Sequence, residues 1–176
     1  MNTLEIYHCL GQLMKRKKGQ YGVIPADYLE HIKIKSYPLA LVVNNESSAY
    51  DGEHWVAIFI KRKSSELEFF CSYGKPISFY SKYFTQFMLR VGSNSIENRI
   101  RVQGPFSRTC GEMTLLFLYK RLKQCPMSSI YCVLSKDFEK NDRIVKSFVR
   151  KLFKSKFIGK NHKGIQCCKC EMDNKS

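Results

Sequence analysis

Apolar residues along the chain repeat with two different periods, which predict helices and buried strands in an interleaved order. Helical spacing or a continuous apolar run predicts helices at residues 3–16, 81–91, 110–123, 128–134 and 138–157. Short apolar runs predict strands at residues 38–44, 55–61, 66–73 and 99–102. Residues 21–29 are expected to be a loop followed by a short helical turn, and residues 92–98 to be a loop. The order of elements predicts an α+β fold with helices flanking a central sheet.

Composition indicates a folded globule rather than a disordered chain. Of the 176 residues, 44% are hydrophobic and 13% aromatic, which is enough for one core. We predict a single domain over residues 1–160, followed by a Cys-rich, flexible tail over 161–176. The tail holds one histidine and three crowded cysteines, two of them adjacent, and a flexible tail is expected there rather than a metal site.

Two features that the sequence does not show indicate the cellular compartment of the protein. No apolar run approaches the ~20 residues that span a bilayer, and the first residues do not resemble a signal peptide. We therefore expect an intracellular protein that is not secreted and has no membrane partner. Its eight cysteines are then expected to be free thiols.

The formal net charge of +15 favours a polyanionic partner, of which nucleic acid is the usual one. The last predicted helix, at 138–157, is apolar on one face and basic over the remainder. Two roles are open for this helix: it docks on the core as a solvated helix, or its basic face contacts phosphates. One helix can do both. Its candidate nucleic-acid-binding residues are Arg143, Lys146, Arg150, Lys151 and Lys154.

Cys110 is the candidate nucleophile, because it stands where a predicted helix begins, just after a turn of small residues. A thiol at a helix N-terminus is expected to have a lowered pKa and to react as its thiolate. Gln103 lies seven residues earlier, and its side-chain amide could fold back beside the cysteine. Together with the backbone N–H of Cys110 it would form an oxyanion hole.

His54 is the candidate general base, since it stands at the mouth of a predicted strand after a glycine turn. The chain thus carries Gly-x-His-Trp, then Phe70-Cys71-Ser72-Tyr73-Gly74, then Val-Gln-Gly-Pro-x-Ser-x-x-Cys-Gly. Over residues 20–122 this combination resembles adenain, a family of viral cysteine endopeptidases related to the ubiquitin-like-protein proteases. The resemblance implies a mixed β-sheet flanked by helices, with the nucleophile at a helix N-terminus.

The same resemblance implies an activity and partners. The substrates would be viral or transposon structural precursors, with DNA as an activator, and the setting a host nucleus or virion. The spacing of Gln103 and Cys110 favours this over an isopeptidase acting on ubiquitin-like modifiers, which remains the alternative. We expect a monomer.

Cys71 departs from the family pattern, because the resemblance places the Asp or Glu of a catalytic triad at this position. A neutral thiol is a poor acceptor and stabilises an imidazolium less than a carboxylate does. Either the Cys–His pair works with a weakened orienting partner, or the chain is a catalytically weak nucleic-acid-binding protein that keeps the fold.

Adenain also uses a peptide cofactor joined through a disulfide. No cysteine lies between Cys71 and Cys110, which argues against a peptide bound by that route. No cofactor is expected to be required for the chemistry itself.

Overall fold

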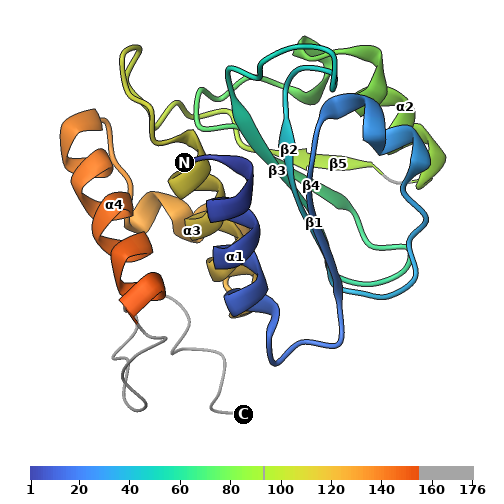
Figure 1. The fold of residues 1–176 in the computed structure, drawn as a ribbon, viewed down its shortest axis with the longest axis horizontal. Helices are drawn as coiled ribbons and strands as arrows, with labels where there is room; N and C mark the ends of the chain where they lie inside the picture. The colour runs from blue at the N-terminus through green and yellow to red at the C-terminus, as the bar shows by residue number, and fades with distance from the viewer. Residues whose placement is uncertain (93, 155–176) are drawn as a thin grey trace.

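A five-stranded mixed sheet with helices on both faces organises the chain, in a computed structural model that describes residues 1–92 and 94–154 (Figure 1). The helices are α1 (Thr3–Met14), α2 (Lys82–Arg90), α3 (Cys110–Leu122) and α4 (Phe138–Lys154), with short 3₁₀ helices η1 (Ala26–His31), η2 (Ile77–Phe79) and η3 (Met127–Cys132). The strands are β1 (Gln20–Ile24), β2 (Leu39–Asn44), β3 (Trp55–Ile60), β4 (Leu67–Phe70) and β5 (Ser95–Glu97).

The strands lie in the order β1-β2-β3-β4-β5. β3 pairs antiparallel with β2 and with β4, whereas the outer strands β1 and β5 pair parallel with their neighbours. The central strands are apolar on both faces because each face is covered: alternate β2 residues join two different cores. The α+β fold with a mixed sheet is therefore confirmed.

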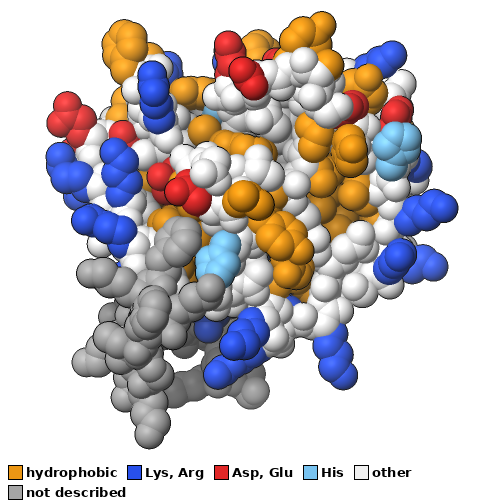
Figure 2. All heavy atoms as spheres, in the orientation of Figure 1, with side chains coloured by type: hydrophobic (Ala, Val, Ile, Leu, Met, Phe, Trp, Pro, Cys, Tyr) orange, Lys and Arg blue, Asp and Glu red, His pale blue; other side chains and the backbone are white. Residues whose placement is uncertain are grey.

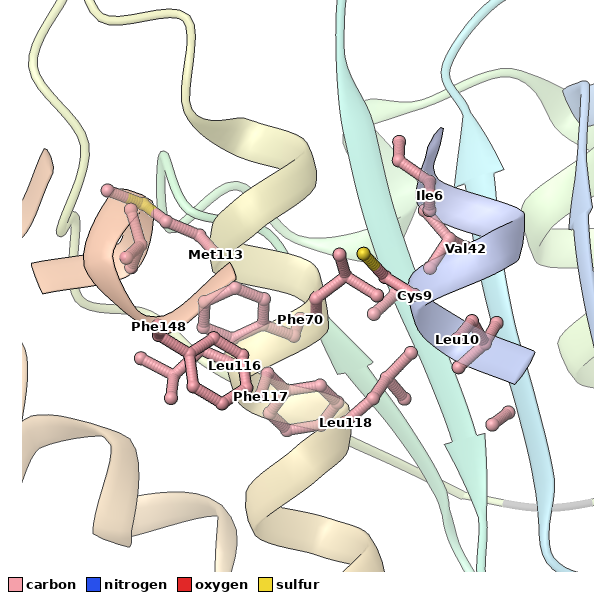
Figure 3. Close-up of a cluster of buried hydrophobic side chains, with 14 of the residues drawn as sticks. Ile6, Cys9, Leu10, Val42, Phe70, Met113, Leu116, Phe117, Leu118 and Phe148 are labelled. Carbon is pink, nitrogen blue, oxygen red and sulfur yellow. The ribbon is translucent and has the colours of Figure 1, made fainter. Parts of the chain in front are cut away.

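α1, α3 and α4 cover one face of the sheet, and η1 and α2 cover the other (Figure 1). α3 is the central helix of its layer, and all of its residues except Tyr119 and Arg121 are buried. Phe117 stacks on Phe70 of β4 with ring centroids 4.8 Å apart, in the core that α1 and α4 close (Figure 3). This burial fixes the position of the first residue of α3, which is Cys110.

Three local predictions are wrong. Residues 20–24 form β1 rather than a loop, because they pair along β2 despite Gly22 and the nearby Pro25. Residues 99–102 are not a strand, and the strand lies at 95–97 within the predicted loop. Backbone groups of the 99–102 segment bond instead to the chain after β4: Val102 N–H donates to Ser72 O at 2.9 Å. The helical stretch predicted near 128–134 is present as a 3₁₀ helix at 127–132, and residues 155–157 lie outside the described residues.

A largely buried ion pair joins α3 to β4. The guanidinium of Arg121 donates to both carboxylate oxygens of Glu68, at 2.6 Å from Nη2 to Oε1, and also to the carbonyl of Cys125. The two side chains are only 11% and 9% exposed. Removing one partner would leave the other charge desolvated and unpaired.

We predict that Arg121→Met lowers the free energy of unfolding by about 3 kcal/mol, because Glu68 loses its buried counter-ion. Arg143→Met is the matched control, since its pair with Glu139 spans 4.0 Å and both side chains are largely exposed. That variant should cost less than about 1 kcal/mol. Urea unfolding of the two variants measures the difference, and equal costs would contradict a stabilising role for the buried pair.

Candidate active site

Cys110 lies at the N-terminus of α3, against the first residue of β3. The backbone N–H groups of Trp55 and Gly111 lie near its sulfur, and both favour the thiolate. The side chain is only 8% exposed, and burial outweighs those donors, so the pKa of the thiol is raised. Glu112 adds a smaller effect in the same direction. The predicted lowering of the Cys110 pKa is therefore wrong for the free protein, because desolvation exceeds the helix effect.

His54 immediately precedes β3, and hydrogen bonds between its backbone groups and Asn45 hold it in place. Its N–H donates to Asn45 Oδ1 at 2.8 Å, and its carbonyl accepts from Asn45 N–H at 2.9 Å. The ring stacks on Tyr73 with centroids 4.6 Å apart and is largely buried. Burial lowers the pKa of His54 to about 4, so the imidazole is neutral at pH 7.

The start of β3 brings His54 and Cys110 to the same corner of the molecule. Trp55, the residue after His54, is the one whose N–H reaches the Cys110 sulfur. Among the described residues, no hydrogen bond joins the imidazole to that sulfur directly. The arrangement therefore places His54 and Cys110 in the same region, with both side chains neutral.

Cys71 follows β4 and faces His54 from the neighbouring strand, as the resemblance led us to expect. Its Sγ lies 3.5 Å from His54 Nε2 and 2.9 Å from the hydroxyl oxygen of Tyr80, and the residue is fully buried. Asn98 holds the Cys71 backbone: Cys71 N–H donates to Asn98 Oδ1 at 2.6 Å, and Asn98 Nδ2 donates to Cys71 O at 2.7 Å. The sulfur is thus fixed beside the imidazole.

Gln103 is buried on the loop that leads to Cys110. Its Oε1 accepts from the hydroxyl of Ser72, and its Nε2 donates to Ser107 O at 2.7 Å. A carboxamide nitrogen carries two hydrogens, so one remains for a further acceptor. The oxyanion role of Gln103 stays a prediction.

Asp142 of α4 anchors the same loop. Its Oδ1 accepts from Ser107 Oγ at 2.8 Å and from Thr109 Oγ1 at 2.7 Å. The preceding Asn141 donates to Val102 O at 2.7 Å. The loop between Gln103 and Cys110 therefore rests on α4 as well as on the chain after β4.

Sequence reasoning missed several residues of this site. Tyr80, Asn98 and Asp142 are far from both motifs along the chain, and no periodicity or spacing marks them. Tyr73 was within the quoted motif, but only the structure shows its ring against His54.

Lys and Arg side chains gather over α4, on the left of the view in Figure 2. Arg143, Lys146, Arg150 and Lys151 are all exposed there. The side chain of Lys154 and the whole tail lie outside the described residues. Within 1–92 and 94–154, no group of three or more His, Cys, Asp or Glu is arranged to hold a metal ion. None of the helices in this part of the chain is long and apolar enough to cross a membrane.

Comparison with known proteins identifies the fold. No protein-family model matches the sequence, and a search of curated proteins finds no relative. Among solved structures, the ASFV pS273R protease superposes on 82% of this chain with a TM-score of 0.60 and 18% identity, and a selenomethionine form gives 0.59. The SUMO protease Ulp1, with its catalytic cysteine oxidized to a sulfinic acid, superposes on 88% of this chain with a TM-score of 0.55 and 12% identity.

The chain shares its fold with these two proteases. It covers 78% of the Ulp1 chain but only 65% of the ASFV pS273R protease chain. At these identities the likeness concerns the fold, and the narrower resemblance to adenain stays a prediction.

We predict that burial of His54 makes the protein lose stability in mild acid. The unfolded chain binds a proton at His54 from about pH 6.5 downward, whereas the folded chain does so only near pH 4. Stability is therefore complete above pH 6.5 and falls as the pH drops towards 4, by about 3 kcal/mol from this group. Urea unfolding across this range should show that His54→Gln removes this part of the loss.

His31→Gln is the control, because the His31 side chain is 71% exposed. It should keep the acid sensitivity of the wild type. If His54→Gln keeps it as well, the imidazole is not buried as a neutral group.

Proposed function

We propose that this protein is a cysteine-type endopeptidase with Cys110 as nucleophile and His54 as general base. The observation that carries the proposal is the contact of the Cys110 sulfur with Trp55 N–H, which sets the nucleophile beside His54 at a helix N-terminus. The shared fold with two proteases supports the same activity. Cys71 occupies the third position of the triad.

In the proposed reaction His54 accepts the thiol proton of Cys110, and the sulfur attacks the scissile carbonyl carbon. The oxyanion is stabilised by the second N–H of Gln103 and the backbone N–H of Cys110. The C–N bond then breaks, and the leaving amine takes the proton from the imidazolium. Water, activated by His54, hydrolyses the thioester and releases the acid.

Burial sets the main energetic obstacle to this reaction. The raised pKa of Cys110 and the lowered pKa of His54 both disfavour the thiolate–imidazolium pair in the free protein. Proton transfer must therefore occur as the substrate binds, with Trp55 N–H and Gly111 N–H offsetting part of the cost of the thiolate. The same obstacle supports the second candidate function, a catalytically weak nucleic-acid-binding protein that keeps the protease fold.

The substrates we propose are structural precursor proteins of a virus or transposon, cleaved in a host nucleus or a virion. A ubiquitin-like modifier joined to a protein is the alternative substrate. We propose that the enzyme acts as a monomer, needs no cofactor for the chemistry, and is activated by DNA bound to the basic face of α4.

We predict that the purified protein cleaves a peptide library and that Cys110→Ala lowers the cleavage rate at least about 10³-fold, because the nucleophile is lost. His54→Ala should give a similar loss. Cys132→Ala is the matched control, since it removes an exposed thiol outside the site and should keep full activity.

Mass spectrometry of the products and of a trapped thioester measures this prediction. Cleavage that survives Cys110→Ala would refute the assignment of the nucleophile. A modifier carrying a fluorogenic C-terminal amide, tested in parallel, separates the isopeptidase alternative from the endopeptidase.

We predict that DNA binding is salt-dependent, without sequence preference, and carried largely by α4. Replacing Arg143, Lys146 and Arg150 by alanine should reduce the slope of log affinity against log salt by up to about three, since each lost phosphate contact removes about 0.9. Fluorescence anisotropy with a labelled duplex measures the slope.

The control removes an equal charge elsewhere, through alanine at Lys15, Arg16 and Lys17, which are exposed just beyond α1. This triple variant should change the slope less. Equal slopes in the two variants would show that binding follows net charge rather than the face of α4.

A further inference from the structure

The sulfur of Cys71 has two polar neighbours that compete for its one proton. Tyr80 Oη lies at 2.9 Å and His54 Nε2 at 3.5 Å. A thiol has a single hydrogen and can also accept a hydrogen bond, so the direction of the proton decides what His54 can do. If the thiol donates to Nε2, the neutral imidazole carries its own hydrogen on Nδ1. If the thiol donates to Tyr80, Nε2–H can donate to the sulfur, and Nδ1 is left with a free lone pair.

Tyr80 is well placed to take this proton. Its ring is held by aromatic contacts with Phe69, Phe79 and Phe84, with centroids 5.6, 5.4 and 5.4 Å away. Either atom of this contact could be the donor, so the Tyr80 oxygen can accept from the thiol. Its contact with the sulfur is the shorter of the two, and hydrogen bonds weaken with distance.

Burial favours the neutral form of both neighbours of the sulfur. It raises the pKa of Tyr80, so the phenol stays neutral and carries its hydrogen at neutral pH. It lowers the pKa of His54 to about 4, which makes the imidazole a weak competitor for the thiol proton. Because Cys71 is fully buried, a hydrogen-bond relay of neutral groups, running through Tyr80, Cys71 and His54, also avoids the cost of a desolvated charge.

We propose that Tyr80 is a positioning residue that accepts the Cys71 S–H, so that the sulfur accepts from His54 Nε2–H and Nδ1 is free to act as the base. A neutral thiol then does part of what a triad carboxylate does: it holds the ring and selects the tautomer. The inference rests on the proposed peptidase function for its consequence in catalysis, but the tautomer itself does not depend on activity.

The first experiment observes the tautomer by ¹⁵N NMR of the full chain with labelled histidine at pH 7. We expect His54 to be protonated at Nε2 in the wild type, and Tyr80→Phe to shift it towards the Nδ1–H form. Tyr83→Phe is the matched control, because it removes a hydroxyl from the neighbouring helix α2 and should leave the spectrum unchanged. Protonation at Nδ1 in the wild type, or an unchanged tautomer in Tyr80→Phe, would overturn the proposal.

The second experiment is a double-mutant cycle on kcat/KM for a cleaved peptide. Tyr80→Phe should lower kcat/KM about fivefold in the wild type, the effect of one ordinary hydrogen bond. In a Cys71→Ala background the same change should have less than about a twofold effect, because no thiol proton remains to be directed. Equal losses in both backgrounds would mean that Tyr80 acts on the structure and not through Cys71.

The two experiments distinguish an error in the proposed function from an error in the proposed role of Tyr80. If the protein cleaves nothing but His54 shifts tautomer in Tyr80→Phe, the proposed function is wrong and the relay stands. If cleavage depends on Cys110 and the tautomer does not respond, the function stands and the relay is refuted.

Discussion

The site depends on one contact, the approach of the N-terminus of α3 to the start of β3. The backbone N–H of Trp55 lies near the Cys110 sulfur, and Trp55 is the covalent neighbour of His54. This approach requires α3 to be sunk into the core, because the helix is buried along nearly its whole length. Gly111 makes part of that possible, since a β-carbon there would lie 3.0 Å from Ile6 Cδ1 of α1. The packing of hydrophobic side chains therefore sets the distance between the two groups that would react.

The same burial opposes ionisation of the groups it positions. His54 and Cys110 are both driven towards their neutral forms by desolvation, and only two backbone N–H groups favour the thiolate. A carboxylate beside the imidazole would compensate in a conventional triad, but this chain has the Cys71 sulfur there. The tyrosine hydroxyl on the other side of that sulfur is the one polar group among the described residues that could redirect its proton.

α4 links the basic surface to the loop between Gln103 and Cys110. Its first turns provide Asn141 and Asp142, which hold the chain around Gln103, while Arg143 and Lys146 project into solvent from the same turns. A ligand that bound α4 would therefore contact a helix that also holds the loop before Cys110. The proposed DNA binding and the loop before Cys110 would thus both depend on α4.

The sequence by itself determined the central elements and the candidate chemistry. Strong hydrophobic patterns specify β2, β3, β4, α1, α2, α3 and α4, because burying them requires a particular period, and the motifs around His54, Cys71 and Cys110 mark the candidate residues. It misplaced β1 and β5, whose short, half-polar segments become strands only through pairing with a neighbouring strand.

Tertiary structure alone decided the electrostatics and the supporting contacts. The helix N-terminus suggested a lowered pKa for Cys110, but the depth of burial reversed the direction. The side chains that hold the site, Tyr80, Asn98 and Asp142, come from separate segments of the chain, and no local pattern reports which segments will meet. Local sequence thus identifies groups capable of the reaction, whereas their protonation and orientation follow from desolvation and hydrogen bonds that exist only after the chain has folded.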